Sequence, residues 1–152
     1  MELNDQPVAK TGMLIRKPVA EVFEAFVDPD VTTKFWFNRA TGGRLETGKT
    51  VQWHWGIYNA TGNVVVKAIE ENERIEIDWG ADADNMTTVE WVFESRSDDS
   101  TYVGITNSGF SGDGDQIVGA TLDSTGGFAL VLAAAKAYLE HGIELNIVED
   151  RF

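Results

Sequence analysis

Residues 115–141, D-Q-I-V-G-A-T-L-D-S-T-G-G-F-A-L-V-L-A-A-A-K-A-Y-L-E-H, decide how this chain folds. They predict one long helix near the end of the chain, because their apolar residues recur at helical spacing. His141 complements the helix dipole, and Gly142 is a natural stop for the last turn. The middle of the helix, Ser124–Gly127, carries only small side chains. These residues are too small to fill the space opposite them, which raises the question of an internal cavity.

The long stretch before this helix, residues 42–109, alternates in steps of two. Residues 75–79, I-E-I-D-W, show the pattern most clearly and predict a half-buried strand. Short turns join the strands, beginning with a short strand at Arg44–Glu46, so we expect an antiparallel meander of six or seven strands. One face should be apolar and rich in tryptophan, and the other acidic. The helix, about 40 Å long, could cross the whole sheet, about 30 Å wide.

Smaller elements precede the sheet. Residues 1–10 have the composition of a loose arm, and Gly12–Lys17 predicts a short strand. Pro18 suits the first position of a helix, whose apolar face runs to Val27. Asp28-Pro29 stops that helix, and Asp30 is a candidate N-cap for a second short helix that runs through Thr33 to Trp36. The predicted fold class is therefore α+β, in one domain that spans residues 1–152.

Composition excludes several classes of function. The 152 residues contain 43% hydrophobic residues and no cysteine. The chain can therefore build a core, but it can form no disulfide, thiolate nucleophile, cysteine zinc site or iron–sulfur site. No uninterrupted apolar run approaches the ~18 residues of a membrane span, and the N-terminus lacks the pattern of a secretion signal. We therefore expect a cytoplasmic protein.

Charge is distributed unevenly along the chain. The formal net charge is −13. Residues 1–69 contain eight basic and seven acidic side chains, whereas residues 70–152 contain four basic and eighteen acidic ones. Phosphate groups bind positively charged surfaces, and this protein is negatively charged, so nucleic acids and anionic membrane surfaces are poor partners.

Several segments match, in order, the pattern of a known family. They are Ile15–Phe26, Asp28-Pro29-Asp30 followed by Trp36, Gly62–Trp79, Thr87–Glu94 with Thr101–Phe110, and Gly127-Phe128. Together they resemble the helix-grip proteins of the START and Bet v 1-like (SRPBCC) superfamily, and within it the activator of Hsp90 ATPase homologue 1-like domain family. The resemblance covers about residues 12–146. Phe128 departs from the family, which usually has tryptophan at this position.

The resemblance implies a helix-grip fold, in which the long C-terminal helix covers the antiparallel sheet and two short helices lie near the N-terminus. The superfamily contains carriers of apolar ligands, cofactor-free cyclases and hydrolases, and chaperone partners. Three classes of function therefore follow. The chain could bind a small apolar molecule, act as a chaperone-interaction module, or be a cofactor-free enzyme. We favour the first, with no cofactor, no metal and no catalytic residue, in a monomer or homodimer.

The inner face of the predicted sheet gathers large aromatic side chains opposite small helix residues. The candidate pocket residues are Trp36, Trp53, Trp55, Trp79, Trp91, Thr121, Thr125 and Phe128. Such side chains either interlock as plain core or line a ligand-sized cavity. Asn107, Thr121, Ser124 and Thr125 are the polar groups available to a ligand, although a hydroxyl in mid-helix can bond the preceding turn instead.

Other candidate sites have simpler interpretations. His54 lies between two tryptophans, so it points to solvent if both face inward and becomes a possible general base only in the opposite register. The carboxylates of Glu76, Asp78, Glu90 and Glu94 belong to the wet face of the sheet. Finally, the apolar residues of the C-terminal segment, residues 143–152, are expected to dock on their own domain.

Overall fold

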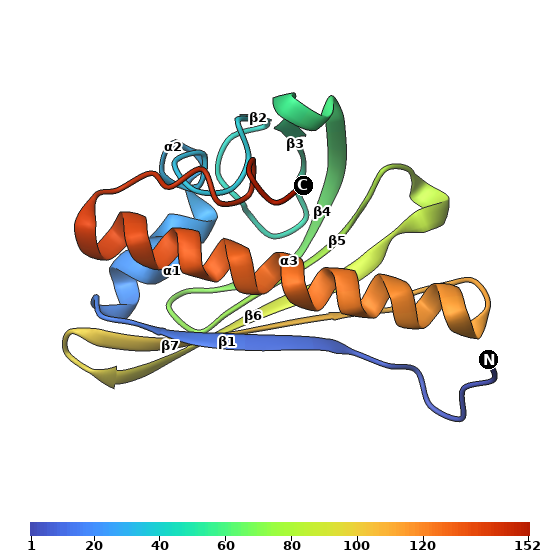
Figure 1. The fold of residues 1–152 in the computed structure, drawn as a ribbon. Coiled ribbons are helices and arrows are strands. Elements are labelled where there is room, and N and C mark those ends of the chain that lie inside the picture. Colours follow the sequence, from blue (N-terminus) through green and yellow to red (C-terminus); the bar gives the residue numbers. More distant parts are fainter.

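The computed structural model describes residues 1–152, which form one sheet with a long helix against it (Figure 1). The elements, in chain order, are β1 (Ala9–Ile15), α1 (Val19–Val27), α2 (Pro29–Thr32), β2 (Arg39–Thr41), β3 (Thr50–Trp55), the 3-10 turn η1 (Gly56–Tyr58), β4 (Ala60–Glu70), β5 (Arg74–Gly80), the 3-10 turn η2 (Ala83–Asn85), β6 (Thr87–Ser97), β7 (Ser100–Ser108) and α3 (Gly114–His141). The predicted α+β helix-grip architecture is confirmed.

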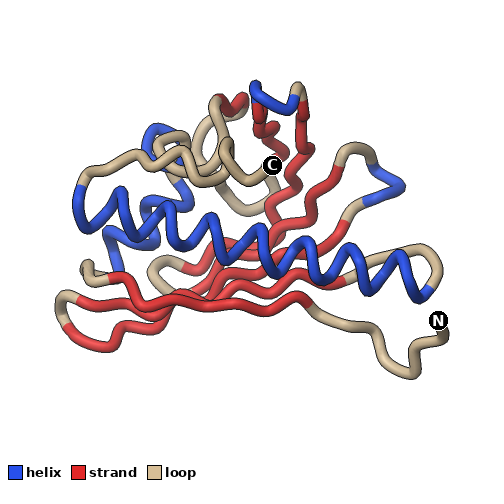
Figure 2. Tube along the Cα trace, in the orientation of Figure 1, coloured by secondary structure: helices blue, strands red, loops and turns tan.

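The sheet has seven strands in the order β1-β7-β6-β5-β4-β3-β2, and every neighbouring pair is antiparallel. Strands β2 to β7 form the predicted meander, and β1 joins its far edge by pairing with β7 from Ala9 opposite Asn107 to Ile15 opposite Thr101. Figure 2 shows the strands curving behind the helix. Alternation decides which side chains face it: Thr101, Val103, Ile105 and Asn107 are buried, and the residues between them are not.

Helix α3 begins and ends with strong local signals. The Asp113 carboxylate accepts a hydrogen bond from the Gln116 amide (2.8 Å), and the Gln116 side chain accepts one from the Asp113 amide (2.9 Å). This reciprocal capping box satisfies two amides at the helix start. At the other end Gly142 takes a left-handed conformation, φ 67°, and closes the helix as predicted.

The path of α3 corrects one expectation. The helix does not cross the full width of the sheet, because its nearest strands are β1 and β7 at one edge (Figure 1). The buried indoles of Trp53 and Trp91, on β3 and β6, and the ring of Phe128 occupy the space between the helix and the farther strands. Side chains of this size keep the helix backbone away from the middle of the sheet.

Length and composition alone would let α3 cross a membrane, since an 18-residue window reaches a mean hydropathy of 1.5. The alanines of α3 raise this average, but charged and polar residues interrupt the apolar run along the helix. In the fold the helix contributes Ile117, Phe128, Val131, Leu132, Ala134 and Ala135 to the buried interior.

Three boundaries near the N-terminus differ from the sequence prediction. Strand β1 starts at Ala9, so the last residues of the expected loose arm are paired in the sheet. Helix α2 is Pro29–Thr32, and Asp28 rather than Asp30 caps it, with its carboxylate accepting from the Asp30 amide (3.0 Å). Proline is suited to the first helical position, which moves the start of the helix back to this residue.

The short strand expected at Arg44–Glu46 is also wrong. The strand at this edge is β2, Arg39–Thr41, and Gly42 and Gly43 follow it with φ of 103° and 75°. Those left-handed conformations end the strand, and the chain then leaves the sheet. Leu45 is nevertheless buried, because its amide donates to the Val27 carbonyl at the end of α1 (3.1 Å) and its side chain enters the core.

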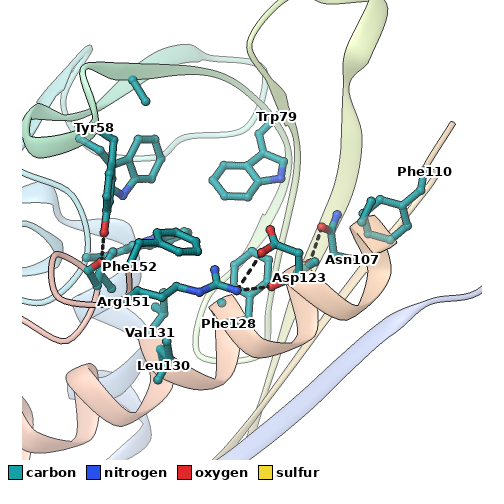
Figure 3. Close-up of a pocket in the computed structure, with 17 residues that line it drawn as sticks. Tyr58, Trp79, Asn107, Phe110, Asp123, Phe128, Leu130, Val131, Arg151 and Phe152 are labelled. Carbon is teal, nitrogen blue, oxygen red and sulfur yellow. Dashed lines mark hydrogen bonds and ion pairs between the residues drawn. The ribbon is translucent and has the colours of Figure 1, made fainter. Parts of the chain in front are cut away.

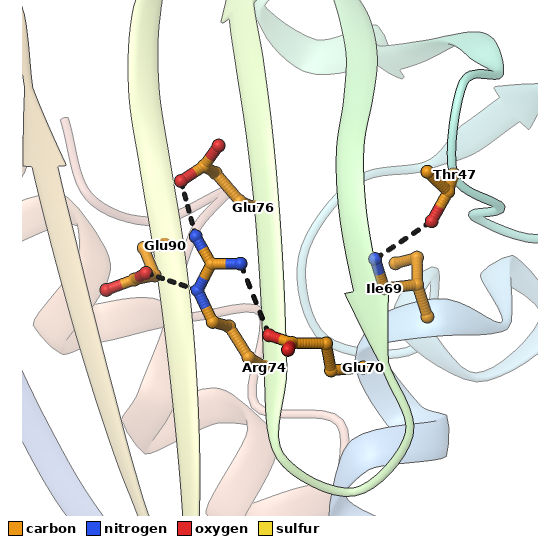
Figure 4. Close-up of polar contacts among 6 residues, drawn as sticks. All are labelled: Thr47, Ile69, Glu70, Arg74, Glu76 and Glu90. Carbon is orange, nitrogen blue, oxygen red and sulfur yellow. Dashed lines mark hydrogen bonds and ion pairs between the residues drawn. The ribbon is translucent and has the colours of Figure 1, made fainter.

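The outer face of the sheet carries the acidic side chains, as predicted, and Arg74 organises three of them (Figure 4). Its guanidinium donates to Glu90 (2.5 Å), Glu76 (2.6 Å) and Glu70 (3.3 Å). The hydrogen bond with Glu90 raises the pKa of Arg74, against a smaller opposing effect of burial. The carboxylates on this face are therefore held by a cation and turned away from the interior.

Candidate ligand pocket

A pocket of about 400 Å³ opens beside the middle of α3, between the helix, the tryptophans of the sheet and the C-terminal segment, residues 143–152 (Figure 3). Its lining residues are Trp36, Trp55, Tyr58, Ala60, Trp79, Asn107, Phe110, Ala120, Asp123, Ser124, Gly127, Phe128, Leu130, Val131, Val148, Arg151 and Phe152. Seven of these 17 side chains are aromatic. The wall is therefore mainly apolar, with a few polar groups from the helix and from β7.

Trp36 is the central ring of the aromatic wall. It lies in the turn after α2, is 7% exposed, and its ring centroid is 4.9 Å from that of Trp53, 5.7 Å from that of Trp79 and 5.8 Å from that of Phe128. The rings meet at tilted or edge-to-face angles, which aromatic pairs prefer over a face-to-face sandwich. This turn brings Trp36 into contact with both the sheet and the helix, so the wall spans the two layers.

The eight predicted pocket residues divide into two groups. Trp36, Trp55, Trp79 and Phe128 line the pocket. Trp53 and Trp91 lie in the packed core, with exposed fractions of 2% and 1%. Both belong to the predicted inner face, but the other rings and α1 cover them before the pocket begins.

The threonines Thr121 and Thr125 do not line the pocket either. The Thr121 hydroxyl donates to the Ile117 carbonyl (2.7 Å), and the Thr125 hydroxyl donates to the Thr121 carbonyl (2.8 Å). Each side chain thus bonds the preceding turn of its own helix, the alternative already open for a hydroxyl in mid-helix. Ser124 behaves differently. Its hydroxyl leaves the helix and donates to the Asn107 side chain on β7 (2.8 Å).

Two further hydrogen bonds hold Asn107, which is 3% exposed. Its amide nitrogen donates to the Thr88 carbonyl (2.8 Å) and to the Thr87 hydroxyl (2.9 Å), both on the neighbouring strand β6. The pair Asn107–Ser124 therefore joins the sheet to the helix at the edge of the pocket. Figure 3 shows this link beside Phe110.

The C-terminal segment closes another side of the pocket, and its docking agrees with the expectation for Ile147 and Val148, whereas Ile143 and Leu145 are exposed. Val148 packs against the core, and its carbonyl accepts from the Tyr58 hydroxyl (2.6 Å). The Arg151 guanidinium donates to the carboxylate of Asp123 (2.9 Å) and to its backbone carbonyl (3.0 Å). Phe152 is exceptional, since it borders the pocket with 87% of its surface exposed.

Sequence reasoning missed Tyr58, Phe110 and Arg151 as pocket residues. Tyr58 belongs to the turn between β3 and β4, and Phe110 to the loop before α3, where no periodicity marks a facing side chain. Arg151 lies in the C-terminal segment, which has no regular element to orient it. The two glycines in the middle of α3 were the one sequence feature that could have indicated these contacts. A helix without side chains at two successive positions leaves room for another group to pack against it.

His54 does not line the pocket. It faces away from Trp53 and Trp55, on the other side of β3, and its Nδ1 lies 3.0 Å from the Thr61 hydroxyl. No group of three or more His, Cys, Asp or Glu side chains is placed to hold a metal ion. The polar chemistry of the pocket therefore rests on Asn107, Ser124 and the Asp123–Arg151 pair.

Among solved structures, this chain is similar to the protein SSP2350 from Staphylococcus saprophyticus, with 32% identity, coverage of 91% of this chain and 96% of that one, and a TM-score of 0.77. DynU16, from the dynemicin biosynthetic locus, is 20% identical, with coverage of 92% and 49% and a TM-score of 0.77. The Aha1 dimer from Colwellia psychrerythraea is 18% identical, with coverage of 90% and 98% and a TM-score of 0.76. The last two likenesses show the fold.

No curated protein matches the chain. A family model does match it, over residues 16–140, and its description is Activator of Hsp90 ATPase homolog 1-like protein. That match covers both short helices, the meander and nearly all of α3. This chain belongs to the family of Activator of Hsp90 ATPase homolog 1-like proteins.

Proposed function

We propose that this protein binds a small, mostly apolar molecule in the pocket beside α3. The observation that carries the proposal is a volume of about 400 Å³ bounded by seven aromatic side chains. Sites for small molecules commonly have volumes of about 300–1,000 Å³ and apolar walls with a few placed polar groups. The pocket has both properties.

The exposure of the tryptophans supports a binding wall rather than an unfilled part of the core. Trp53 and Trp91 are fully packed, whereas Trp55 and Trp79 are half-buried and border the pocket. Their uncovered ring surface is apolar area that a ligand would remove from water. Each 100 Å² of such area contributes about 2.5 kcal/mol to association before the costs of binding are subtracted.

The titratable side chains in the lining favour binding over catalysis. They are Tyr58, Asp123 and Arg151. The Tyr58 hydroxyl bonds backbone carbonyls of the C-terminal segment, and the other two side chains pair with each other. Each group is engaged in holding the pocket together, so a general acid or base is not supplied by this set.

Native mass spectrometry of freshly purified protein tests the proposal. We expect a fraction of the protein to carry a noncovalent small molecule, and we expect that mass to disappear on denaturation. Extraction with organic solvent then identifies the molecule. Protein that carries nothing, and that also fails to bind neutral aromatic probes in an NMR titration, would contradict the proposal.

A further inference from the structure

The hydrogen bonds around Asn107 fix which way its side-chain amide points. The Thr88 backbone carbonyl lies 2.8 Å from one amide atom of Asn107, and a carbonyl can only accept. That atom must therefore be the nitrogen. The same nitrogen donates its second hydrogen to the Thr87 hydroxyl (2.9 Å), so both amide hydrogens are used on β6.

The amide oxygen of Asn107 consequently faces α3, and this fixes the hydroxyl hydrogen of Ser124. The Ser124 oxygen lies 2.8 Å from the Asn107 oxygen, so the serine is the donor in this contact. A serine hydroxyl has one hydrogen and two lone pairs. With its hydrogen committed, Ser124 can offer a ligand only acceptor lone pairs, and Asn107 likewise has only its oxygen left to offer.

The charges at the pocket cancel. Asp123 and Arg151 are the charged residues of the lining, and their side chains are 2.9 Å apart. Because these two charges already pair with each other, the lining offers no unpaired charge to a charged ligand. The pocket is therefore matched to a neutral molecule.

We propose that the pocket selects neutral aromatic molecules that carry a hydroxyl or N–H donor, and that this donor binds the Ser124 hydroxyl oxygen, which Asn107 holds as an acceptor. Phenols are the simplest members of this class. The inference rests on the proposed binding function and adds to it the polarity of the contact at Ser124. Ser124 is then the specificity-determining residue of the helix, a role that its neighbour Thr125 cannot share.

Two matched probes test this inference: β-naphthol and its methyl ether. Both have the same rings, but the ether has lost the donor and has gained a methyl group. A purely hydrophobic pocket prefers the ether, because a buried methyl group favours binding. An acceptor raises the affinity for the naphthol relative to that for the ether. We expect the ratio of the two affinities to be about fivefold higher in the wild-type protein than in a variant without the acceptor, the effect of one net hydrogen bond.

The affinities are measured by NMR titration, with the side-chain signals of the five tryptophans as reporters. In Ser124→Ala the ratio of naphthol affinity to ether affinity should fall about fivefold, because the acceptor is lost. Ser124→Thr keeps an oxygen at this position and should restore the ratio. Thr125→Ala is the matched control, because its hydroxyl bonds the Thr121 carbonyl, and it should behave as wild type.

The outcomes separate this inference from the proposed function. If both probes bind and Ser124→Ala leaves the ratio of their affinities unchanged, the acceptor assignment is overturned and the pocket function stands. If neither probe shifts any tryptophan signal, both are overturned. A ratio that falls in Ser124→Ala supports both.

Discussion

The guanidinium of Arg151 lies in the space that a side chain on Gly127 would occupy. A Cβ atom built on Gly127 would lie 2.8 Å from Arg151 Nη1, whereas one on Gly126 would lie 3.5 Å from Nη2. The two neighbouring glycines of α3 are thus not equivalent. Gly127 makes room for the C-terminal segment, and the small-residue patch that suggested a cavity is partly covered by this arginine.

This difference predicts unequal contributions to stability from two alanine substitutions. Gly126→Ala should raise the free energy of unfolding by about 1 kcal/mol, because alanine is a much better helix former than glycine. Gly127→Ala should gain clearly less, since the new methyl group displaces Arg151 from Asp123. Urea denaturation measures both. Arg151→Ala should remove the difference between the two positions, and equal effects in the wild-type background would show that Arg151 does not occupy this space.

The pocket predicts that two buried valines differ in the stability lost when each is replaced by phenylalanine. Val131 lines the pocket, whereas Val103 on β7 is fully buried and does not. Val131→Phe should be tolerated, with a loss below about 1 kcal/mol, while Val103→Phe should lose about 1–3 kcal/mol through overpacking. Thermal and urea unfolding give the comparison, and Val131→Phe should also weaken binding of β-naphthol. Similar losses at both positions would mean that the space beside Val131 cannot accept a ring.

The end of α3 predicts a pH-dependent contribution from Glu140. Partial burial would raise the pKa of this carboxyl, but the Arg16 amide (2.9 Å) and the Lys136 ammonium (2.5 Å) donate to it and lower its pKa. A lowered pKa means that the stabilisation is complete above the unfolded pKa and is lost as pH falls through the folded value. Glu140→Gln should therefore cost about 1 kcal/mol near pH 7, and this cost should shrink as the pH falls through the folded pKa.

Unfolding as a function of pH measures the effect of Glu140, with Glu144→Gln as the control. Glu144 is an exposed carboxylate of the C-terminal segment, outside this network, and its replacement should change stability little at any pH. A cost of Glu140→Gln that is the same at both ends of the pH range would place its contribution in packing and not in charge.

The acidic outer face predicts a salt-dependent effect at Arg74. Arg74→Met leaves the carboxylates of Glu70, Glu76 and Glu90 close together without a cation. It should cost about 1 kcal/mol at low salt, and the cost should shrink at about 1 M salt, where the Debye length is about 3 Å. Arg96→Met, which frees one carboxylate, Glu94, is the control for a single exposed pair. The prediction fails if the cost of Arg74→Met does not depend on salt.

Local patterns in the sequence were enough to predict the main strands and the long helix. The alternation at residues 75–79 and at residues 101–107 specifies which side chains face inward, because successive residues of a strand point to opposite faces. The capping residues Asp113 and Gly142 act within one turn of the ends of α3. Where local signals compete, as at Asp28, Pro29 and Asp30, the boundary could be placed only to within a few residues.

The sequence by itself determined the strands of the meander other than β2, the long helix and the apolar inner face, because each depends on residues a few positions apart. Only the tertiary structure decided which tryptophans line a pocket, that the Ser124 hydroxyl leaves its helix while that of Thr125 does not, and that Arg151 lies against Gly127. These choices depend on contacts between residues far apart in the chain. Ser124 donates a hydrogen bond to Asn107 on β7, and Arg151 packs against the middle of α3. Such contacts leave no periodic trace in the sequence, because they depend on how distant elements pack against each other.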